Sequence, residues 1–169
     1  MQRKTFRDMP CPIARSLERI GEWWSILILR EAFYGATRFD TFQKNLDIAP
    51  SMLTRRLNGL VDEGLMDRRQ YSLKPPRFEY VLTECGRDFL PVMLSMLEWG
   101  NKYFAPDGIS AQLVDKETGR RAEPVLVDAG SGKPVSFARH IIAPGPAAPE
   151  GMRRRLEEAA AFMSAPTKQ

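Results

Sequence analysis

The stretch IAPSMLTRRLNGLVDEGLMDRRQYSLKPPRFEY, residues 48–80, concentrates positive charge around one predicted helix and one predicted hairpin. Arg55 and Arg56 lie inside a leucine-patterned segment. Further along, residues 66–77 contain a single acidic residue, Asp67, and four basic ones: Arg68, Arg69, Lys74 and Arg77. The whole chain has a formal net charge of only +4, which by itself permits an acidic partner without requiring one. The positive charge is concentrated locally in this stretch.

Residues 50–63 have the apolar period of an amphipathic helix. Leu53, Leu57 and Leu60 follow one another at the spacing of one helical face. Pro50 suits a first helical turn, and Gly64 is a typical stop. We therefore predict a helix from Pro50 to Glu63 with one buried side.

The opposite side of this helix carries short polar groups and an arginine. At about 100° per residue, Ser51, Arg55 and Asn58 face outward, with Thr54 beside them. Arginine is the usual partner of guanine and asparagine of adenine, and serine or threonine serves bases or phosphates. Asp62 would repel phosphate, so contact is expected from Ser51 to Asn58 only. A solvated face is the alternative for Arg55, whereas Arg56 borders the apolar stripe and favours helix packing or a phosphate contact.

Two strands, Met66–Tyr71 and Phe78–Leu82, are predicted around a proline turn. A stiff basic hairpin beside a recognition helix is suited to following the phosphate backbone or entering a minor groove. The alternative is an edge hairpin whose charges prevent aggregation.

The flanking segments complete the pattern of a winged helix. Helices are predicted at Pro12–Ile20, at Glu22–Tyr34 as a buried core helix, and at Phe39–Asn45. A long helix follows the hairpin at Glu84–Phe104, with a kink at Pro91. The predicted fold class is mainly α with a small β-hairpin wing, a winged helix-turn-helix, plus a small β-rich C-terminal extension.

Composition narrows the functional class. The 169 residues suffice for one domain and an appendage. Two cysteines exclude a disulfide framework and fit a reducing compartment, and we find neither a signal peptide nor a membrane span, so a cytoplasmic protein is expected. One histidine, no nucleophile–base pair and no metal-ligand cluster argue against an enzyme, and no metal or cofactor is predicted.

Several motifs together resemble the HxlR-type winged helix-turn-helix transcriptional regulators. They are CPIARSLERIGEWWSILILREAFYGATRFDTFQ, MLTRRLNGLVDEGL, RFEYVLTECGRDF and MLEWG, in this order from Cys11 to Phe104. The resemblance implies a bacterial regulator that binds double-stranded DNA as a homodimer. The expected DNA-binding residues are Arg38, Ser51, Met52, Thr54, Arg55, Asn58, Arg68, Arg69, Tyr71, Lys74 and Arg77.

The resemblance also implies a dimer interface built from the first and last helices of the domain. Its expected residues are Pro12, Leu17, Leu94, Leu97, Trp99 and Phe104. The Glu84–Phe104 helix has two apolar lines; one is expected to serve the domain's own core, and the second needs another surface, most simply a second copy. The alternative is a helix enclosed within one subunit. A dimer places two recognition helices about 34 Å apart on a pseudo-palindromic operator.

Cys11 is a candidate redox sensor. It precedes Pro12 at a helix start, where the partial positive charge favours a thiolate, and Arg7 and Arg15 are near in sequence. The resemblance adds that some relatives sense oxidants through such a cysteine. The alternative is a small packed hydrophobe, and Cys85 is expected to be packed. The aromatic residues Trp23, Trp24, Phe33 and Trp99 are expected in the core rather than in a ligand pocket, and any small-molecule effector is unknown.

The last third of the chain contains two similar turns, LVDKETGR from Leu113 and LVDAGSGK from Leu126. Asp115, Thr118, Asp128 and Ser131 occupy the positions that cysteines would take in a zinc ribbon, and aspartate hydrogen bonds are able to close such turns without metal. A ribbon-like module and chance similarity are both open. The predicted segments are 1–105, the DNA-binding and dimerisation domain; 106–142, the ribbon-like extension; and 143–169, a proline-rich linker with a short helix.

Two functions remain in view. The first is a dimeric, sequence-specific transcription regulator. The second is a winged-helix protein-interaction module that does not read DNA. Salt separates them, because phosphate neutralisation makes affinity fall steeply with salt and an apolar interface responds little.

Overall fold

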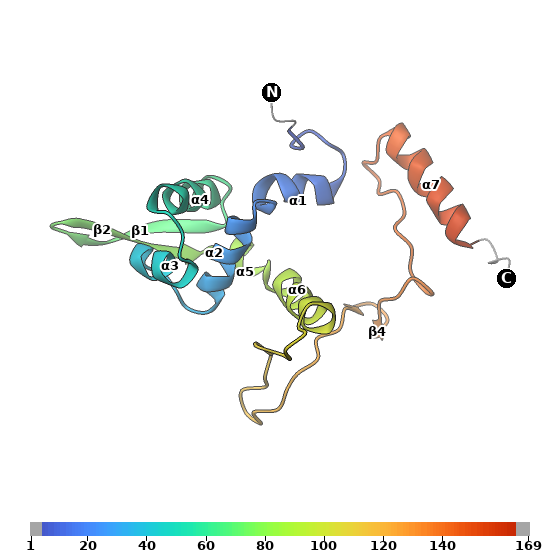
Figure 1. The fold of residues 1–169 in the computed structure, drawn as a ribbon. Helices are drawn as coiled ribbons and strands as arrows, with labels where there is room; N and C mark the ends of the chain where they lie inside the picture. The colour runs from blue at the N-terminus through green and yellow to red at the C-terminus, as the bar shows by residue number, and fades with distance from the viewer. Residues whose placement is uncertain (1–4, 165–169) are drawn as a thin grey trace.

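The computed structural model describes residues 5–164, shown as a ribbon in Figure 1. The elements are, in order, α1 Pro12–Ile20, α2 Trp23–Phe33, α3 Phe39–Leu46, α4 Pro50–Asp62, β1 Met66–Leu73, β2 Pro76–Leu82, α5 Glu84–Arg87, α6 Leu90–Tyr103, β3 Val127–Asp128, β4 Lys133–Pro134 and α7 Glu150–Ser164. The predicted fold class is confirmed: a helical body, a two-stranded antiparallel wing and a second small hairpin in the extension. In the described part of the chain, no helix is long and apolar enough to cross a membrane.

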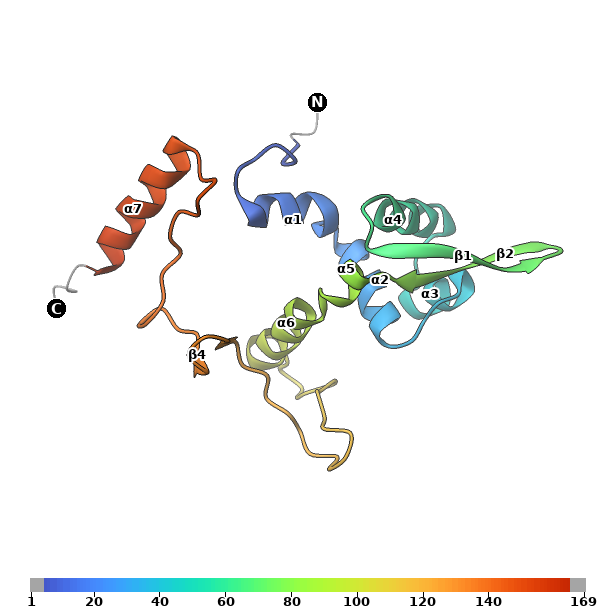
Figure 2. The same cartoon turned by 180° about the vertical axis from the view of Figure 1, so that it is seen from behind.

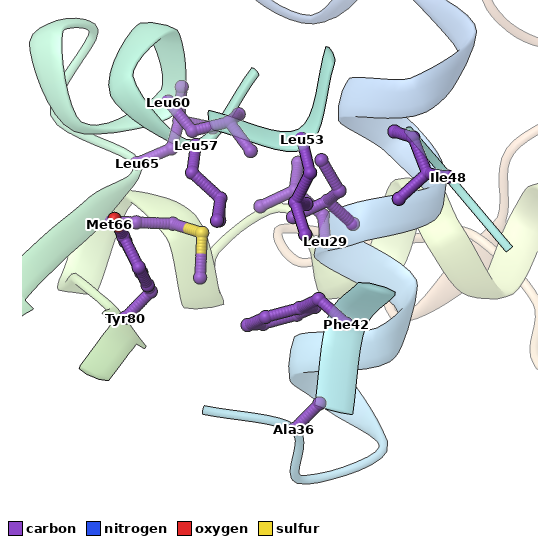
Figure 3. Packing of buried hydrophobic residues seen from close by; sticks show 11 residues of the cluster. Leu29, Ala36, Phe42, Ile48, Leu53, Leu57, Leu60, Leu65, Met66 and Tyr80 are labelled. Carbon is purple, nitrogen blue, oxygen red and sulfur yellow. The ribbon is translucent and has the colours of Figure 1, made fainter. Parts of the chain in front are cut away.

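The core is organised by α4, as its leucine period predicts. Leu53, Leu57 and Leu60 are at most 1% exposed. They pack with side chains from α2, α3, the wing and the connections between these elements (Figure 3): Ile28, Leu29, Ala36, Phe42, Ile48, Leu65, Met66 and Tyr80. Gly64 ends α4 at a φ of 73°, a backbone conformation that glycine adopts without strain. The predicted helix-turn-helix is therefore held by one compact apolar cluster.

The helix α2 is less enclosed than its sequence predicts. Only Ser25, Ile28, Leu29 and Glu31 are buried, while Trp23 is 81% exposed. The Glu31 carboxylate accepts hydrogen bonds from Arg30 Nη2 (2.8 Å) and Asn45 Nδ2 (2.8 Å), which joins α2 to α3. The prediction of an all-round buried helix is wrong because α3 and α4 cover one side of α2 and α6 covers the other side only loosely.

The wing is longer than predicted and contains a bulge. Its strands pair from Met66 with Leu82 to Leu73 with Pro76, and the register shifts between Gln70 and Ser72. Tyr71 is the extra residue at this shift, and bulges commonly change the direction of a side chain. Arg38 bridges to β2 at Glu79, so the segment before α3 extends the sheet by one short rung.

The predicted single helix Glu84–Phe104, kinked at Pro91, is wrong: the chain forms two helices. The first, α5, ends at Arg87, and α6 begins at Leu90 with Pro91 in its first turn. Proline has no N–H to donate and clashes with the carbonyl four residues earlier, here that of Arg87. At the start of a new helix neither defect matters, so the chain breaks before Pro91 and restarts.

The helix α6 projects from the body (Figure 1) and has no buried residue. Of the apolar line expected to serve the domain's own core, Phe89, directly before α6, packs against the core cluster, and Met93 is half-buried. A groove of about 230 Å³ separates α6 from α2, lined by Ile26, Leu27, Phe33, Met93, Leu97 and neighbours. Both apolar lines of α6 are thus available to other surfaces.

The two turns of the extension are closed by aspartate side chains, as their sequences predict. Asp115 Oδ1 accepts hydrogen bonds from the N–H (2.7 Å) and the hydroxyl (2.8 Å) of Thr118. Asp128 makes equivalent bonds to Ser131. Hydrogen bonds from Thr118 lower the pKa of Asp115, and those from Ser131 and Gly130 lower the pKa of Asp128. No group of potential metal ligands lies together among the described residues.

Candidate nucleic-acid interface

The outward side of α4 has the predicted composition. Ser51, Thr54, Arg55 and Asn58 are exposed, whereas Met52 is half-buried and packs against the core. The Thr54 hydroxyl donates to the carbonyl of Pro50 (2.9 Å) in its own helix, so it can offer a partner its methyl group and its oxygen as an acceptor, but no donor. Within residues 5–164, Arg55 makes no hydrogen bond or ion pair.

The first turn of α4 adds backbone donors that side-chain patterns do not show. Ala49 is the N-cap and provides no side-chain hydrogen bond, and Pro50 has no N–H. The N–H groups of Ser51 and Met52 therefore belong to the uncapped start of a helix, which carries partial positive charge and suits a phosphate. This part of the site lies at the N-terminal half of α4, where base contact is expected.

Arg56 packs inside the domain, which confirms the packing interpretation and separates it from Arg55. Its Nη2 lies 2.8 Å from Glu22 Oε2, and its side chain is 15% exposed. Glu22 is the N-cap residue of α2. The pair therefore fixes the orientation of α4 against the junction of α1 and α2.

The acidic end of α4 is neutralised by a partner that sequence reasoning missed. Glu63 pairs with Arg7 from the N-terminal segment and with Arg19 of α1, whose Nε lies 3.3 Å from Glu63 Oε2. Arg7 is 56 positions away in the chain, so no local pattern connects the two residues. Consequently less negative charge opposes phosphate at this end than the sequence indicates.

The predicted basic residues in and beside the wing fall into two groups: some contact an aromatic ring or a carboxylate, and others do not. Arg68 stacks on Phe78, with Cζ 3.7 Å from the ring centroid, and Arg69 lies 3.4 Å from Asp67. Arg38 stacks on Tyr71 at 3.3 Å and approaches Glu79 at 3.8 Å. Such stacking orients a guanidinium without neutralising it. Lys74 and Arg77 at the tip have no ion pair or hydrogen bond within the described residues.

The expected dimer residues lie on the side of the molecule that bears α1 and α6. Leu17, Trp99 and Phe104 are exposed, Pro12 is exposed, and Leu94 and Leu97 are half-buried. Trp99 and Phe104 meet edge to face, with ring centroids 4.8 Å apart. The expectation that Trp23 and Trp99 belong to the core is wrong, because neither α2 nor α6 encloses them.

The two cysteines differ in setting. Cys11 is the N-cap of α1 and is half-buried, whereas Cys85 is exposed, so the expectation of a packed Cys85 is wrong. Cys85 lines a groove between α1 and α5–α6 together with Pro12 and Ile13. Of the two arginines near Cys11 in sequence, Arg7 binds Glu63, and Arg15 donates to the carbonyl of Pro10 (3.3 Å), the residue before Cys11.

Comparisons with known proteins agree on one family. Residues 19–108 match the model of the HxlR-like helix-turn-helix family. An uncharacterized HTH-type transcriptional regulator of Mycobacterium tuberculosis is 40% identical over 135 residues, covering 79% of this chain and 85% of the relative.

Solved structures show the same likeness. PA1374, a candidate transcription factor from Pseudomonas aeruginosa, has 51% identity and a TM-score of 0.63, covering 86% of this chain and 100% of that one. The oxidized form of the redox regulator HypR has 36% identity and a TM-score of 0.51, covering 54% of this chain and 96% of that one.

Proposed function

Because the chain belongs to the HxlR-like helix-turn-helix family of DNA-binding transcriptional regulators, we propose that it acts in the cytoplasm as a homodimer on a pseudo-palindromic operator. The N-terminal half of α4 enters the major groove, where Ser51, Arg55 and Asn58 read base edges. Met52 and Thr54 contribute their apolar edges at the same surface. The wing follows the backbone through Arg38, Arg68, Arg69, Tyr71, Lys74 and Arg77.

One observation carries this proposal: Arg55, Lys74 and Arg77 lie on adjoining elements, α4 and the wing, and their exposed side chains have no ion pair or hydrogen bond with residues 5–164. If Arg55 were only part of a solvated face, there would be no reason for two further exposed basic side chains on the adjoining wing. Around them, Arg38 and Arg68 are oriented by stacking on Tyr71 and Phe78, so part of the ordering cost is met before DNA arrives.

The test is to measure binding to the DNA upstream of the protein's own gene by fluorescence anisotropy at a series of salt concentrations. We expect the logarithm of affinity to fall linearly with the logarithm of salt, with a slope of about −0.9 per neutralised phosphate. An affinity that is flat in salt supports the protein-interaction alternative. If no binding occurs at low salt, selection from genomic fragments replaces the upstream DNA, and failure there rejects the proposal.

The homodimer is supported by apolar surface that one chain leaves open. Ile13 and Leu17 of α1, and Met96 and Trp99 of α6, are all exposed. A second copy related by a two-fold axis covers both helices with the same patch, which closes the assembly. Sedimentation equilibrium is expected to give twice the 19.2 kDa chain mass, and a 19.2 kDa species at micromolar concentration rejects the dimer.

A redox response through Cys11 is the second part of the proposal. Its support is the position of Cys11 at the N-cap of α1, on the proposed dimer helix, together with the likeness to the redox regulator HypR. A peroxide converts the thiol to a sulfenic acid and is itself reduced to water. The added polar oxygen at the start of α1 then disturbs the packing of the two copies and weakens operator binding.

The two cysteines provide a matched test. Peroxide treatment is expected to weaken DNA binding by the natural chain and by Cys85→Ser, but not by Cys11→Ser. Equal loss in all three proteins, or no loss in the natural chain, rejects Cys11 as the sensor and leaves DNA binding itself unaffected.

A further inference from the structure

The C-terminal arm, defined here as residues 127–164, exposes large apolar side chains in the single chain. Phe137 is 77% exposed and Phe162 is 83% exposed, with Ile141 and Ile142 also open. Among the described residues, the hydrogen bonds and ion pairs of residues 127–158 lie within the arm, apart from the bond from Val135 N–H to the carbonyl of Leu126 (2.8 Å). Residues 127–158 are therefore shaped mainly by bonds within the arm.

Such a segment does not bury enough surface to fold alone. Its regular structure consists of one hairpin, whose two strands have two residues each and whose turn is closed by Asp128, and of the helix α7. Ordering each residue costs conformational entropy, which an exposed hairpin and a single helix do not offset. The apolar residues of the arm therefore require a surface outside it.

The preceding residues show where that surface begins. Before the arm, the chain runs along α6, where Arg121 pairs with Glu98 (2.9 Å) and Asn101 donates to the carbonyl of Ala111 (2.9 Å). Leu126 then lines a hollow together with Leu90 and Leu94 of α6. The arm thus starts on the helix proposed to meet the second copy. In Figures 1 and 2 it curves from there toward the side of α1 and ends in α7, away from the wing.

The arm is also part of the structure shared with a relative. The match with PA1374 covers 86% of this chain and 100% of that solved chain. Because the residues before the arm make up a smaller share than this, the match extends into the arm. Its counterpart of the arm is consequently ordered at least in part, which fits a docked segment better than a solvated tail.

We propose that the arm of each copy docks on the α1–α6 side of the second copy, so that the homodimer is clasped by two exchanged C-terminal segments. This inference rests on the proposed homodimer. Phe137 and Ile142 insert between the copies, and α7 packs beyond them with its Leu156 side, which is half-buried already. The 127–164 segment is then a dimerisation element that the first 105 residues do not contain.

Site-specific photo-crosslinking in the full chain tests this arrangement. The photoreactive residue p-benzoylphenylalanine replaces Phe137 in one protein, Trp99 in a second and Leu73 in a third. Leu73 is 78% exposed at the wing, which matches the exposure of Phe137 in the single chain. We expect irradiation to give dimer-mass products from the Phe137 and Trp99 positions, with α1 or α6 peptides attached, and none from Leu73.

Each other outcome has a definite meaning. A dimer-mass product from Trp99 with only monomer-mass product, or none, from Phe137 overturns the exchanged arm and leaves the homodimer standing. No dimer-mass product from either position, together with sedimentation as a monomer, rejects the homodimer and the arm with it.

A pair of substitutions gives an independent readout. Phe137→Ser with Ile142→Ser is expected to raise the dimer dissociation constant at least tenfold, while Leu73→Ser leaves it unchanged. Unchanged folding, checked by circular dichroism, keeps the comparison valid because neither site belongs to the core. Equal dissociation constants for the double variant and the natural chain overturn the inference.

Discussion

Arg55 and Arg56 are neighbours in the chain with opposite roles. Arg55 is exposed and has no partner among the described residues, whereas Arg56 is mostly covered and pairs with Glu22. Helical geometry alone indicates this division, because a turn of about 100° takes the second arginine to the edge of the leucine stripe. The identity of its partner was not predictable, since Glu22 belongs to another helix.

We expect Arg55→Ala to cost about 1–3 kcal/mol of DNA binding and to relax the preference at one base pair. Lys74→Ala is the control at the wing: it should weaken binding to every sequence alike and reduce the salt slope by about 1. Anisotropy on the operator and on single-base variants measures both effects. If DNA affinity is unchanged in both variants, neither α4 nor the wing contacts DNA in the way that we propose.

Arg56→Ala is expected to act on stability instead. Removing it leaves Glu22 without this ion pair in a partly covered site, which costs roughly 1–3 kcal/mol of unfolding free energy. Arg55→Ala is the matched control and should change stability by less than about 0.5 kcal/mol. Denaturant unfolding measures both, and equal stability of the two variants contradicts the packing role of Arg56.

At the scale of elements, local patterns predicted the helix-turn-helix and the hairpin, and missed what distant contacts decide. The period of Leu53, Leu57 and Leu60 was sufficient for α4 because its burial is one-sided. Pro91 was recognised as a disturbance, but whether it kinks or divides a helix depends on the packing of the short α5. The exposure of Trp23 was missed because apolar composition does not distinguish a core position from an open surface. Trp99 was expected both in the core and at the dimer interface, and its exposure excludes the core in the single chain.

The short helix α5 is fitted closely against the end of α4. Gly86 is buried, and a Cβ at this position would collide with the carbonyl oxygen of Leu65. Gly86→Ala is therefore expected to destabilise the protein by about 1–3 kcal/mol. In Gly59→Ala the added methyl meets nothing within 4 Å, and because Gly59 lies inside α4 we expect a gain of up to about 1 kcal/mol. Thermal unfolding that ranks the two variants in the opposite order contradicts this packing.

The aspartate turns of the extension should respond to acid. Hydrogen bonds hold the pKa of Asp115 and Asp128 below the ordinary value of about 3.9, so the carboxylates support the turns fully above that value. This support is lost as the pH falls through the lowered folded-state pKa values. Amide signals of Thr118 and Ser131 followed by NMR between pH 6 and pH 2 should shift only below about pH 4. A shift centred near pH 6 would assign the change to another group.

At the scale of the whole molecule, the chain combines a DNA-binding body with surfaces that one copy leaves uncovered. The proposed contacts with phosphates and bases lie on α4 and the wing, and α6 and the arm extend away from the wing (Figure 2). The resemblance of residues 11–104 to a known family was sufficient for the class of function. The arm lies outside that resemblance. Its sequence indicated a short terminal helix with one apolar side but not the surface that this side would meet, so the proposed role of the arm rests on the structure.

The most direct test of the central claim is a hydroxyl-radical footprint on DNA selected by the purified protein. Two recognition helices in one dimer should protect two patches whose centres lie about 34 Å apart along one face of the duplex. Further protection on the flanking backbone is expected from the two wings, and Lys74→Ala should reduce the flanking protection only. A single protected patch, or selected DNA without any footprint, would contradict a dimeric operator-binding regulator.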